Sequence, residues 1–496
     1  MFYAAVGIKQ IQAHLARSRH LWGRRGASDM LFYLTDVSGV ADGIQRSDRN
    51  LWTVTEILST HPGVALNPDA ADTDGVVQLM SADRAKVEAA AREIAINVKL
   101  HLPAATVETS IREAATFVDT LRAERDAQPA DNRAYPSSVI EFPLAHHCDE
   151  CSSAMASGRI TVREQQLRLC RDCASRAPGP RNVTLQRARE TPVSGFMVEQ
   201  RMLRDLKLNQ VEDFKQLAKL GRLPEGHAPR TSTDNHIATI FADGNGLGAL
   251  FDHLREDAIE KGNTGHLLDV SKRIKNATED GLKAAIRSTL SPERDGAIMA
   301  AIPHILGGDD VLVSVPATRV WPFLRAFMTT MKDKLSDEAF EGAGSISFSA
   351  GVVICHQAFP IGDQVELAEN LLRRAKKQVY GDGWTFAWQD VTNEGTSPGD
   401  RVLAMEDWPR LDELIHTAKN LGEERKGNTA RATVRSELRI PDIETRSLRL
   451  RHLADRLGGA KDLFDLAFGN SWREGNVTDA HTSDLLAALS IMRWLA

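Results

Sequence analysis

The sequence predicts an α+β protein with two ferredoxin-like halves, a cysteine-rich insertion between them and a helical C-terminal region. Three observations support this prediction. The chain is 496 residues long, which corresponds to about three domains at roughly 150 residues each. Apolar strand patterns alternate with helical patterns in two separate stretches, and two Cys-x-x-Cys pairs lie between those stretches. Several independent cores are therefore expected.

The first half of the chain has the strand and helix order of one α+β domain. Strand patterns occur at 2–7, 76–81 and 106–109, and helical patterns occur at 8–25, 82–101 and 111–125. This alternation is typical of a sheet that is covered by helices. We place the domain at residues 1–135 and expect it to be the structural partner of the second half.

The pattern is clearer in the second half. Apolar strands at 236–243, 298–306, 311–316 and 345–354 alternate with helical stretches at 247–290, 317–336 and 364–379. Read in order, this is the β-α-β-β-α-β plan of a ferredoxin-like domain with a tight hairpin between its second and third strands. We place this domain at residues 236–395. A linker with a polar helix at 198–220 occupies 181–235, and a helical C-terminal domain occupies 396–496.

Composition limits the possible classes of protein. Hydrophobic residues make up 42% of the chain and charged residues 26%, which are values of a globular protein. The 61 Lys and Arg are outnumbered by 67 Asp and Glu, so a uniformly basic protein that coats nucleic acid is excluded, although local basic patches are not. No apolar run approaches the roughly 20 residues that span a bilayer, and the N-terminus is too polar for a signal peptide. A cytoplasmic protein without membrane contact is expected.

Four of the five cysteines form two matched pairs with 18 residues between them. They are Cys148, Cys151, Cys170 and Cys173. This spacing is typical of a zinc ribbon, in which four thiolates bind one structural zinc ion, and we place the ribbon at residues 136–180. A redox-active pair is the alternative, but two matched copies favour a shared metal. His146 and His147 could also serve as ligands, although four cysteines suffice, and Cys355 is expected to be a small core residue.

Three carboxylates occupy the ends of predicted strands in the second half. Asp243 ends an apolar strand and precedes Gly-Asn-Gly, while Asp309 and Asp310 lie in the hairpin turn after another apolar strand. We expect these two strands to be neighbours, so the three carboxylates should meet at one edge of the sheet. Their mutual repulsion favours bound Mg²⁺ or Mn²⁺. Two such ions can stabilise the attacking and leaving oxygens of an in-line phosphoryl transfer.

Glycines surround these carboxylates. They are Gly244, Gly246, Gly248, Gly307 and Gly308. Glycine permits tight turns and leaves the surface free of side chains, so a triphosphate could approach the backbone and a helix N-terminus there. Taken alone, Gly-Gly-Asp-Asp is more often an ordinary hairpin turn. Its position between two apolar strands, together with the Asp-Gly-Asn-Gly of the neighbouring motif, favours the catalytic interpretation.

The motifs together resemble a known family. Segments 241–252, 305–316 and 347–377 are similar to the catalytic palm of the large polymerase-cyclase subunit of type III CRISPR effector complexes, and more distantly to GGDEF-type nucleotide cyclases. Segment 8–36 resembles the start of that subunit's first, degenerate palm in the Cmr-type branch. The resemblance implies an α+β fold with two ferredoxin-like palm domains, a zinc-ribbon insertion and a helical C-terminal domain.

The resemblance also implies a reaction and its residues. Asp243, Asp309 and Asp310 would hold two catalytic Mg²⁺ or Mn²⁺ ions, and Lys376, or the adjacent Lys377, would pair with the triphosphate. The other nucleotide-binding positions would be Gly244, Asn245, Gly246, Gly307 and Gly308. The implied activity joins ATP into cyclic oligoadenylate when the complex holds target RNA. The implied partners are ATP, guide RNA, target RNA and the other effector subunits, and the implied structural metal is zinc.

Some features depart from the family pattern or leave alternatives open. Many members begin with an HD nuclease domain, whereas this chain has no His-Asp dipeptide, and its first palm has no Gly-Gly-Asp-Asp. We therefore expect one catalytic centre and no DNA cleavage. A non-catalytic scaffold subunit and a stand-alone cyclase are the alternative functions. The stretch 421–451 carries eight Lys or Arg and five Asp or Glu, so it is either a solvated helical face or a contact with RNA or a subunit.

Overall fold

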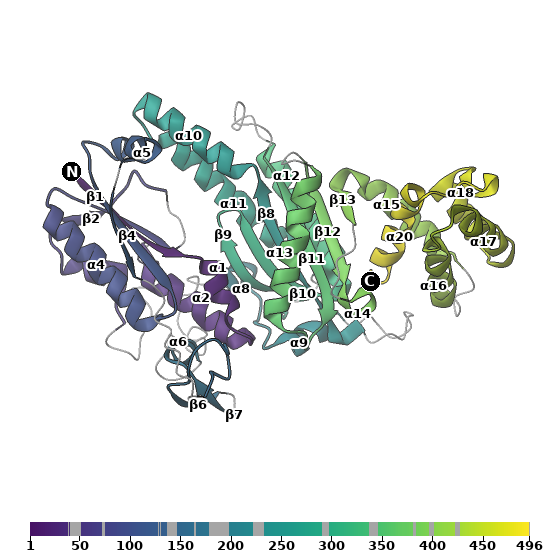
Figure 1. Cartoon of the computed structure of the whole chain (residues 1–496), viewed down its shortest axis with the longest axis horizontal. Helices are drawn as coiled ribbons and strands as arrows, with labels where there is room; N and C mark the ends of the chain where they lie inside the picture. The colour runs from purple at the N-terminus through teal and green to yellow at the C-terminus, as the bar shows by residue number, and fades with distance from the viewer. Residues whose placement is uncertain are drawn as a thin grey trace.

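The computed structural model of the chain has two large sheets, a small hairpin module and a helical C-terminal region (Figure 1). It describes residues 1–37, 39, 51–71, 75–126, 128, 130–135, 146–162, 165–177, 198–221, 233–289, 297–336, 346–379, 383–395, 401–421 and 427–495. The five-stranded sheet of the N-terminal domain lies at one end of the molecule, the six-stranded sheet of the central domain lies in the middle, and the C-terminal helices lie at the other end. The predicted α+β fold class is confirmed.

The N-terminal domain is built on antiparallel strands in the spatial order β2-β3-β1-β4-β5. The strands are β1 (Phe2–Lys9), β2 (Val64–Leu66), β3 (Val76–Ser81), β4 (Thr106–Glu113) and β5 (Asp131–Tyr135). The helices are α1 (Ile11–Ala16), α2 (Leu21–Thr35), α3 (Val54–Ser59), α4 (Arg84–His101) and α5 (Phe117–Arg125). The first four strands have the ferredoxin-like order, with the first strand between the third and the fourth.

Two strands of this domain, β2 and β5, were not predicted from the sequence. In addition, residues 111–113 continue β4 instead of starting a helix. The helix α5 begins only at Phe117, because Thr116 and Asp119 form a capping box that satisfies the free backbone N–H groups of its first turn. The polar composition of Thr106–Glu113 concealed the second half of that strand.

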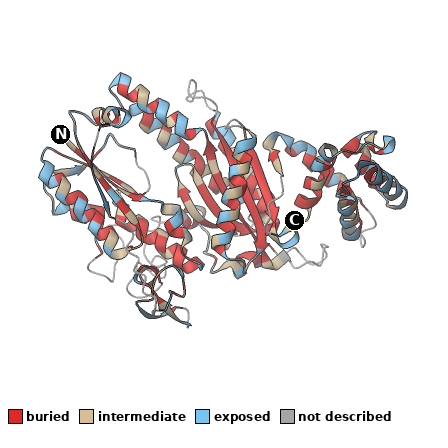
Figure 2. Cartoon of the chain, viewed as in Figure 1, coloured by how far each residue is buried: buried red, intermediate tan, exposed pale blue. Residues whose placement is uncertain are grey.

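The central sheet has the order β13-β12-β11-β8-β10-β9, and β11 and β12 are its only described parallel pair. Its strands are β8 (His236–Asn245), β9 (Ile302–Gly307), β10 (Asp310–Pro316), β11 (Ser347–His356), β12 (Thr385–Asp390) and β13 (Val402–Ala404). Its long helices are α10 (Leu247–Lys261), α11 (Gly265–Ser288), α12 (Val320–Leu335) and α13 (Ile361–Gln378). Strands β8 to β11 reproduce the predicted ferredoxin-like plan, and Figure 2 shows that β8, β10 and β11 are buried almost throughout.

One expectation about this sheet was wrong. The strand that precedes the Asp309 turn, β9, is not a neighbour of β8, because the second strand of a ferredoxin-like sheet takes the edge position. The neighbour of β8 is β10, the strand that follows the turn. The helices expected at 247–290 are α10 and α11, and Gly262 ends α10 with a φ of 65°.

A small module separates the two sheets in sequence. It contains the hairpin β6 (Gly158–Val162) and β7 (Gln165–Leu169), followed by α6 (Arg171–Arg176), and it protrudes below the N-terminal domain in Figure 1. The predicted helix at 198–220 is divided into α8 (Val198–Leu206) and α9 (Phe214–Lys219), because Lys207 has a left-handed φ of 54°.

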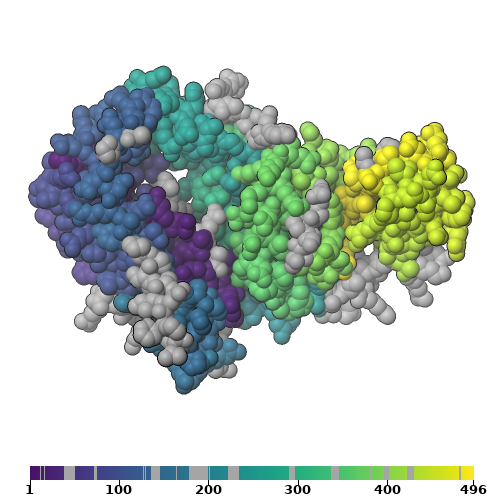
Figure 3. All heavy atoms as spheres, in the orientation of Figure 1, coloured from purple at the N-terminus to yellow at the C-terminus, as the bar shows by residue number. Residues whose placement is uncertain are grey.

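The C-terminal region is helical, as predicted, and lies beyond the β13 edge of the central sheet (Figure 3). Its helices are α15 (Trp408–Lys419), α16 (Gly427–Leu438), α17 (Ile443–Arg456), α18 (Ala460–Phe468), α19 (Ser471–Glu474) and α20 (Asp479–Met492). Trp408 and Trp494 join it to the core of the central domain. Within the described ranges, no helix combines the length and apolar character needed to cross a membrane.

Candidate functional site

The three predicted carboxylates lie at one end of β8. Val311 pairs with Ala242 in the antiparallel ladder, which places Asp310, at the start of β10, level with Asp243. Asp309 occupies the turn between β9 and β10. A Cβ atom added to Gly244 would lie 3.3 Å from the Asp309 carboxylate, so that carboxylate lies against the β8 backbone, and the same atom would lie 2.3 Å from the Leu247 side chain.

The turn that carries Asp309 has only two residues. Gly307 and Asp310 pair with each other across the hairpin, and Gly308 has a φ of 61° with open space around it. A positive φ at the first central position of a two-residue hairpin turn favours glycine. The turn therefore places Asp309 at the tip of a hairpin, and Gly308 leaves the surface of the turn itself open.

The carboxylates interact strongly. Burial, then the hydrogen bond and negative charge of Asp243, then the charge of Asp310, raise the pKa of Asp309 to about 8. A divalent cation offsets such crowded negative charge, and carboxylate oxygens are the ligands that Mg²⁺ and Mn²⁺ prefer. Asp243 and Asp309, whose carboxyl groups are hydrogen-bonded, thus fit a shared hard divalent cation. The oxygens of all three carboxylates do not lie within 4.8 Å of one another, as the four cysteine thiols do.

A lysine on α13 lies beside Asp243. The Nζ of Lys376, in the last turn of α13, contacts Oδ2 of Asp243 and donates to the carbonyl oxygen of Gly244 at 2.7 Å. The neighbouring Lys377 is exposed on the outer side of the helix. Of the two lysines considered from the sequence, Lys376 is therefore the one beside the carboxylates.

The other predicted nucleotide-binding positions surround this point in different ways. Gly246 is the N-cap of α10 and has a φ of 69°, so the start of that helix lies next to the carboxylates. The Asn245 side chain is buried and donates to Ser347 Oγ at 3.0 Å and to the carbonyl oxygen of Gly383 at 2.9 Å. The amide group of Asn245 thus holds neighbouring strands together.

Three buried polar residues near the carboxylates were not predicted from the sequence. Ser347 and Ser349 carry buried hydroxyl groups on β11, the strand next to β8, and Thr385 carries one on β12, the strand beyond β11. The sequence pattern of β11 could have indicated the two serines, because serines at alternate positions of an otherwise apolar strand share one face of the sheet. That face is the one covered by α13.

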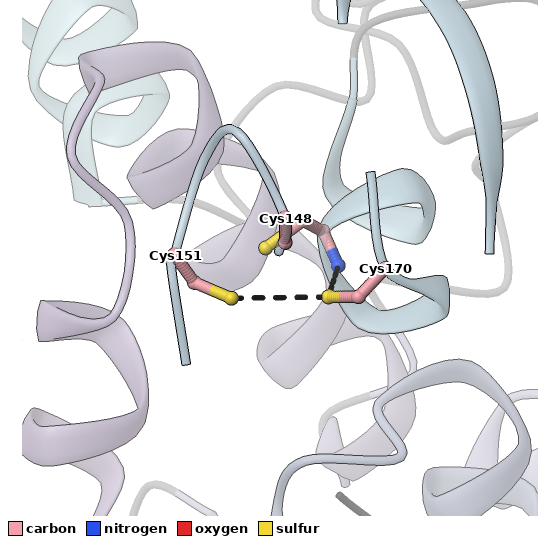
Figure 4. A group of neighbouring side chains, drawn as sticks. Cys148, Cys151 and Cys170 are labelled. Atoms are coloured by element: carbon pink, nitrogen blue, oxygen red, sulfur yellow. Dashed lines mark hydrogen bonds between the residues drawn. The ribbon is translucent and has the colours of Figure 1, made fainter. Parts of the chain in front are cut away.

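The four paired cysteines form a second, separate cluster. All four Sγ atoms lie within 4.8 Å of one another, and three of the four thiols are labelled in Figure 4. Such a tetrahedral thiolate set is compatible with structural zinc. Neither His146 nor His147 belongs to the cluster: both are exposed, and the His146 ring contacts Arg168 at 3.0 Å. Cys355 is buried in the core beside β8, as expected.

The residues between the paired cysteines attach the module to the N-terminal domain. Glu150 is fully buried and accepts hydrogen bonds from the backbone N–H of His20 at 2.9 Å and from its ring at 2.5 Å. Asp172 pairs with Arg176 at 2.5 Å and accepts from the backbone of Ala104 at 3.1 Å. Each Cys-x-x-Cys segment thus supplies two thiols of the cluster and a carboxylate that docks the module.

The stretch 421–451 is not one continuous solvated face. Arg446 points inward, where its guanidinium donates to the carbonyl oxygens of Ile440 and Val477 at 2.8 Å each and contacts Asp479. Arg449 and Arg451 are exposed on the same helix. Arg446 therefore supports the fold of the C-terminal region, and so does Arg435, which donates to the carbonyl oxygen of Leu489 at 3.4 Å.

With the strand order and the carboxylate hairpin in place, the central domain has the architecture of a palm domain. Residues 236–382 match the family model described as "Cas10/Cmr2, second palm domain". This segment contains Asp243, Asp309, Asp310 and Lys376. Comparison with curated proteins gives no match.

Solved structures resemble nearly the whole chain. The crystal structure of the Csm1–Csm4 cassette in complex with cA4 matches with a TM-score of 0.53 and 13% identity, covering 99% of this chain and 69% of that chain. The crystal structure of Csm1 in T. onnurineus matches with a TM-score of 0.51 and 13% identity, covering 100% and 70%. The apo Csm1–Csm4 cassette matches with a TM-score of 0.50 and 14% identity, covering 99% and 69%. The chain therefore shares a Csm1-like fold.

Proposed function

We propose that the protein is a metal-dependent nucleotidyltransferase that joins ATP into cyclic oligoadenylate, acting as the large subunit of a type III CRISPR effector complex. The observation that carries this proposal is the placement of Asp243, Asp309 and Asp310 at one end of β8, with Lys376 beside Asp243, inside the segment that matches the Cas10/Cmr2 palm. The cA4 bound to the Csm1–Csm4 cassette of similar fold supports cyclic oligoadenylate as the product class.

In this proposal, the 3′-hydroxyl of one ATP attacks the α-phosphorus of a second ATP, a new phosphodiester bond forms, and pyrophosphate leaves. Bound Mg²⁺ or Mn²⁺ would supply charge neutralisation at the attacking and leaving oxygens. Asp243, Asp309 and Asp310 would hold the ions. Lys376 would place its positive charge beside the phosphates, and the open turn at Gly307 and Gly308 would leave the phosphates room.

The remaining parts have supporting roles in the proposal. The N-terminal domain, residues 1–135, would be a non-catalytic palm that forms one wall of the nucleotide site, and segment 8–36 favours the Cmr-type branch. The cysteine cluster would hold one structural zinc ion in the reducing environment of the cytoplasm. Guide RNA, target RNA and the other effector subunits would be the partners, and target RNA would switch synthesis on.

The test is to incubate the purified complex with ATP, Mg²⁺ and matched target RNA and to identify the products by mass. Cyclic oligoadenylate that forms only with matched RNA is the expected result. An assembled, RNA-bound complex that makes no nucleotide product would instead indicate a scaffold subunit. Product formation by a chain that copurifies with neither small RNA nor other subunits would indicate a stand-alone cyclase.

A further inference from the structure

A row of buried hydroxyl groups lies beneath the carboxylate site. In the register of the central sheet, Asp243 on β8 is opposite Ser349 on β11, and Ser349 is opposite Thr385 on β12. Residues at directly opposite positions project from the same face of a sheet. The face in question is packed against α13, the helix that carries Lys376. The row therefore runs from the carboxylate site to the underside of the lysine helix.

The hydrogen bonds of this row have a definite direction. Thr385 Oγ1 donates to the carbonyl oxygen of Ala375 at 3.2 Å, and Ser349 Oγ lies 2.8 Å from Thr385 Oγ1. A hydroxyl has a single hydrogen to donate, so Ser349 is the donor to Thr385. Ser349 is 0% and Thr385 1% exposed, which means that water cannot replace either bond. The row ends on the backbone of α13.

The carbonyl at the end of the row is one that the helix cannot satisfy by itself. Because α13 ends at Gln378, Ala375 carries one of the last four carbonyl groups, which have no N–H partner within the helix. The Thr385 hydroxyl supplies the missing partner. Lys376 is the next residue, and its Nζ donates to the Gly244 carbonyl at 2.7 Å. The hydroxyl row thus acts on the backbone next to the lysine.

The same helix is held closely against the sheet along its length. A Cβ atom added to Gly351 on β11 would lie 1.9 Å from the carbonyl oxygen of Ala368, so the α13 backbone touches the strand there. At the start of the helix, Thr239 Oγ1 donates to Gln364 Oε1 at 2.5 Å. The helix therefore has little freedom to shift, and the last turn is the part whose position depends on Thr385.

We propose that Thr385, oriented by Ser349, is a positioning residue that fixes the last turn of α13 and so aims the Lys376 ammonium group at Asp243 and at the nucleotide phosphates. This inference rests on the proposed nucleotidyltransferase function. Apolar side chains would fill the same space without the cost of burying hydroxyl groups. Hydroxyl groups add direction, because a hydrogen bond specifies where the carbonyl must lie.

The test compares Thr385→Val, which keeps the shape and removes the hydroxyl, with Thr385→Ser, which keeps the hydroxyl. We expect Thr385→Val to raise the KM for ATP about tenfold and Thr385→Ser to restore it to within about twofold. In a Lys376→Ala background, Thr385→Val should change KM by less than about twofold, because its effect acts through the lysine. Thr278→Val is the matched control, since Thr278 is also buried and donates to a helix carbonyl, that of Ile274, at 2.8 Å.

A second measurement does not depend on activity. Backbone hydrogen exchange of residues 375–379 should be at least about fivefold faster in Thr385→Val than in the unmodified protein or Thr278→Val, in the absence of nucleotide. Unchanged exchange and KM in Thr385→Val would overturn the positioning role. An equal rise in KM with and without Lys376 would also overturn it, because the effect would then be general destabilisation. If the unmodified protein makes no nucleotide product, the proposed nucleotidyltransferase function is wrong. The hydrogen-exchange rates of residues 375–379 then decide by themselves whether Thr385 positions the last turn of α13.

Discussion

The ammonium group of Lys376 contacts the carboxylate of Asp243, although 133 positions separate the two residues in the sequence. The contact joins the last turn of α13 to the end of β8. Both side chains are about one quarter exposed, at 29% and 26%, so a ligand can still reach them. The Lys376–Asp243 pair is therefore part of the proposed catalytic site, and the predictions below concern this site first.

Removing the hairpin carboxylates should abolish nucleotide synthesis. We expect the double variant Asp309→Ala, Asp310→Ala to make no detectable product while it still assembles and binds RNA, because both side chains lie at a hairpin tip and not in the core. Asp243→Ala should have the same effect, and adding it to the double variant should change little, since residues that serve one metal centre fail together. Resolved product mass is the measurement. The control is Asp252→Ala on the exposed side of α10, which should retain synthesis.

The two adjacent lysines of α13 should behave differently. Lys376→Ala should lower kcat/KM for ATP by at least about tenfold, because it removes the positive charge next to the carboxylates. Lys377→Ala is the matched control and should change it by less than about twofold, since its side chain is exposed and points elsewhere. Equal losses in the two variants would contradict the assignment of Lys376.

Zinc content tests the cysteine cluster. The purified, reduced protein should contain about one zinc ion per chain by elemental analysis. Cys148→Ser and Cys173→Ser should each lower that content and make residues 146–177 more sensitive to proteolysis, because the thiolates and their metal stabilise this short module. Cys355→Ala should leave the zinc content unchanged, since Cys355 is not part of the cluster. Freshly prepared protein without zinc would refute the assignment.

A buried ion pair joins the N-terminal domain to α8. Arg25 donates to Glu199 Oε2 at 2.7 Å and to the carbonyl oxygens of Val211 and Glu212 at 3.0 and 3.1 Å. Arg25→Ala would leave Glu199 charged and buried, so we expect a loss of about 3–5 kcal/mol in the free energy of unfolding, measured by denaturant titration. The control is Arg325→Ala, which breaks the exposed pair with Asp412 and should cost about 0–1 kcal/mol.

Removing both charges of the Arg25–Glu199 pair should destabilise the protein less than removing Arg25 alone. In the double variant Arg25→Ala, Glu199→Ala, no charge remains unpaired, and we expect it to be more stable than Arg25→Ala alone. A double variant that is less stable than either single variant would show that Glu199 has a separate role.

The sequence predicted the central domain better than the N-terminal one for a physical reason. The motif around Asp243 and the Asp309 hairpin combine apolar strands with glycines at their ends, and both signals are local. The strand β5, by contrast, has no fully buried residue and one paired neighbour, β4, among the described strands, so its sequence lacks the alternation that marks a half-buried strand. The strand β2 was missed because its three residues are too few to show a strand pattern.

The candidate site was predicted in part because its residues belong to recognisable local motifs. Thr385 was not predicted, since its importance depends on the register of β11 with β12 and on where α13 ends. The contact of Arg25 with Glu199 was equally hidden, because 174 positions separate the two residues. The identity of the neighbour of β8 was mistaken because the order of strands in a sheet differs from their order along the chain.

The helix α2 is in contact with several parts of the molecule at once. The backbone N–H of His20, the N-cap of α2, donates to Glu150 of the cysteine module. Arg25, within the same helix, donates to Glu199 on α8. Regions that share a buried helix in this way unfold together and not one after another. Heating the metal-bound protein should therefore melt the N-terminal domain, the cysteine module and α8 as one cooperative unit, and a chelator that opens the cysteine module should lower the melting temperature of all three.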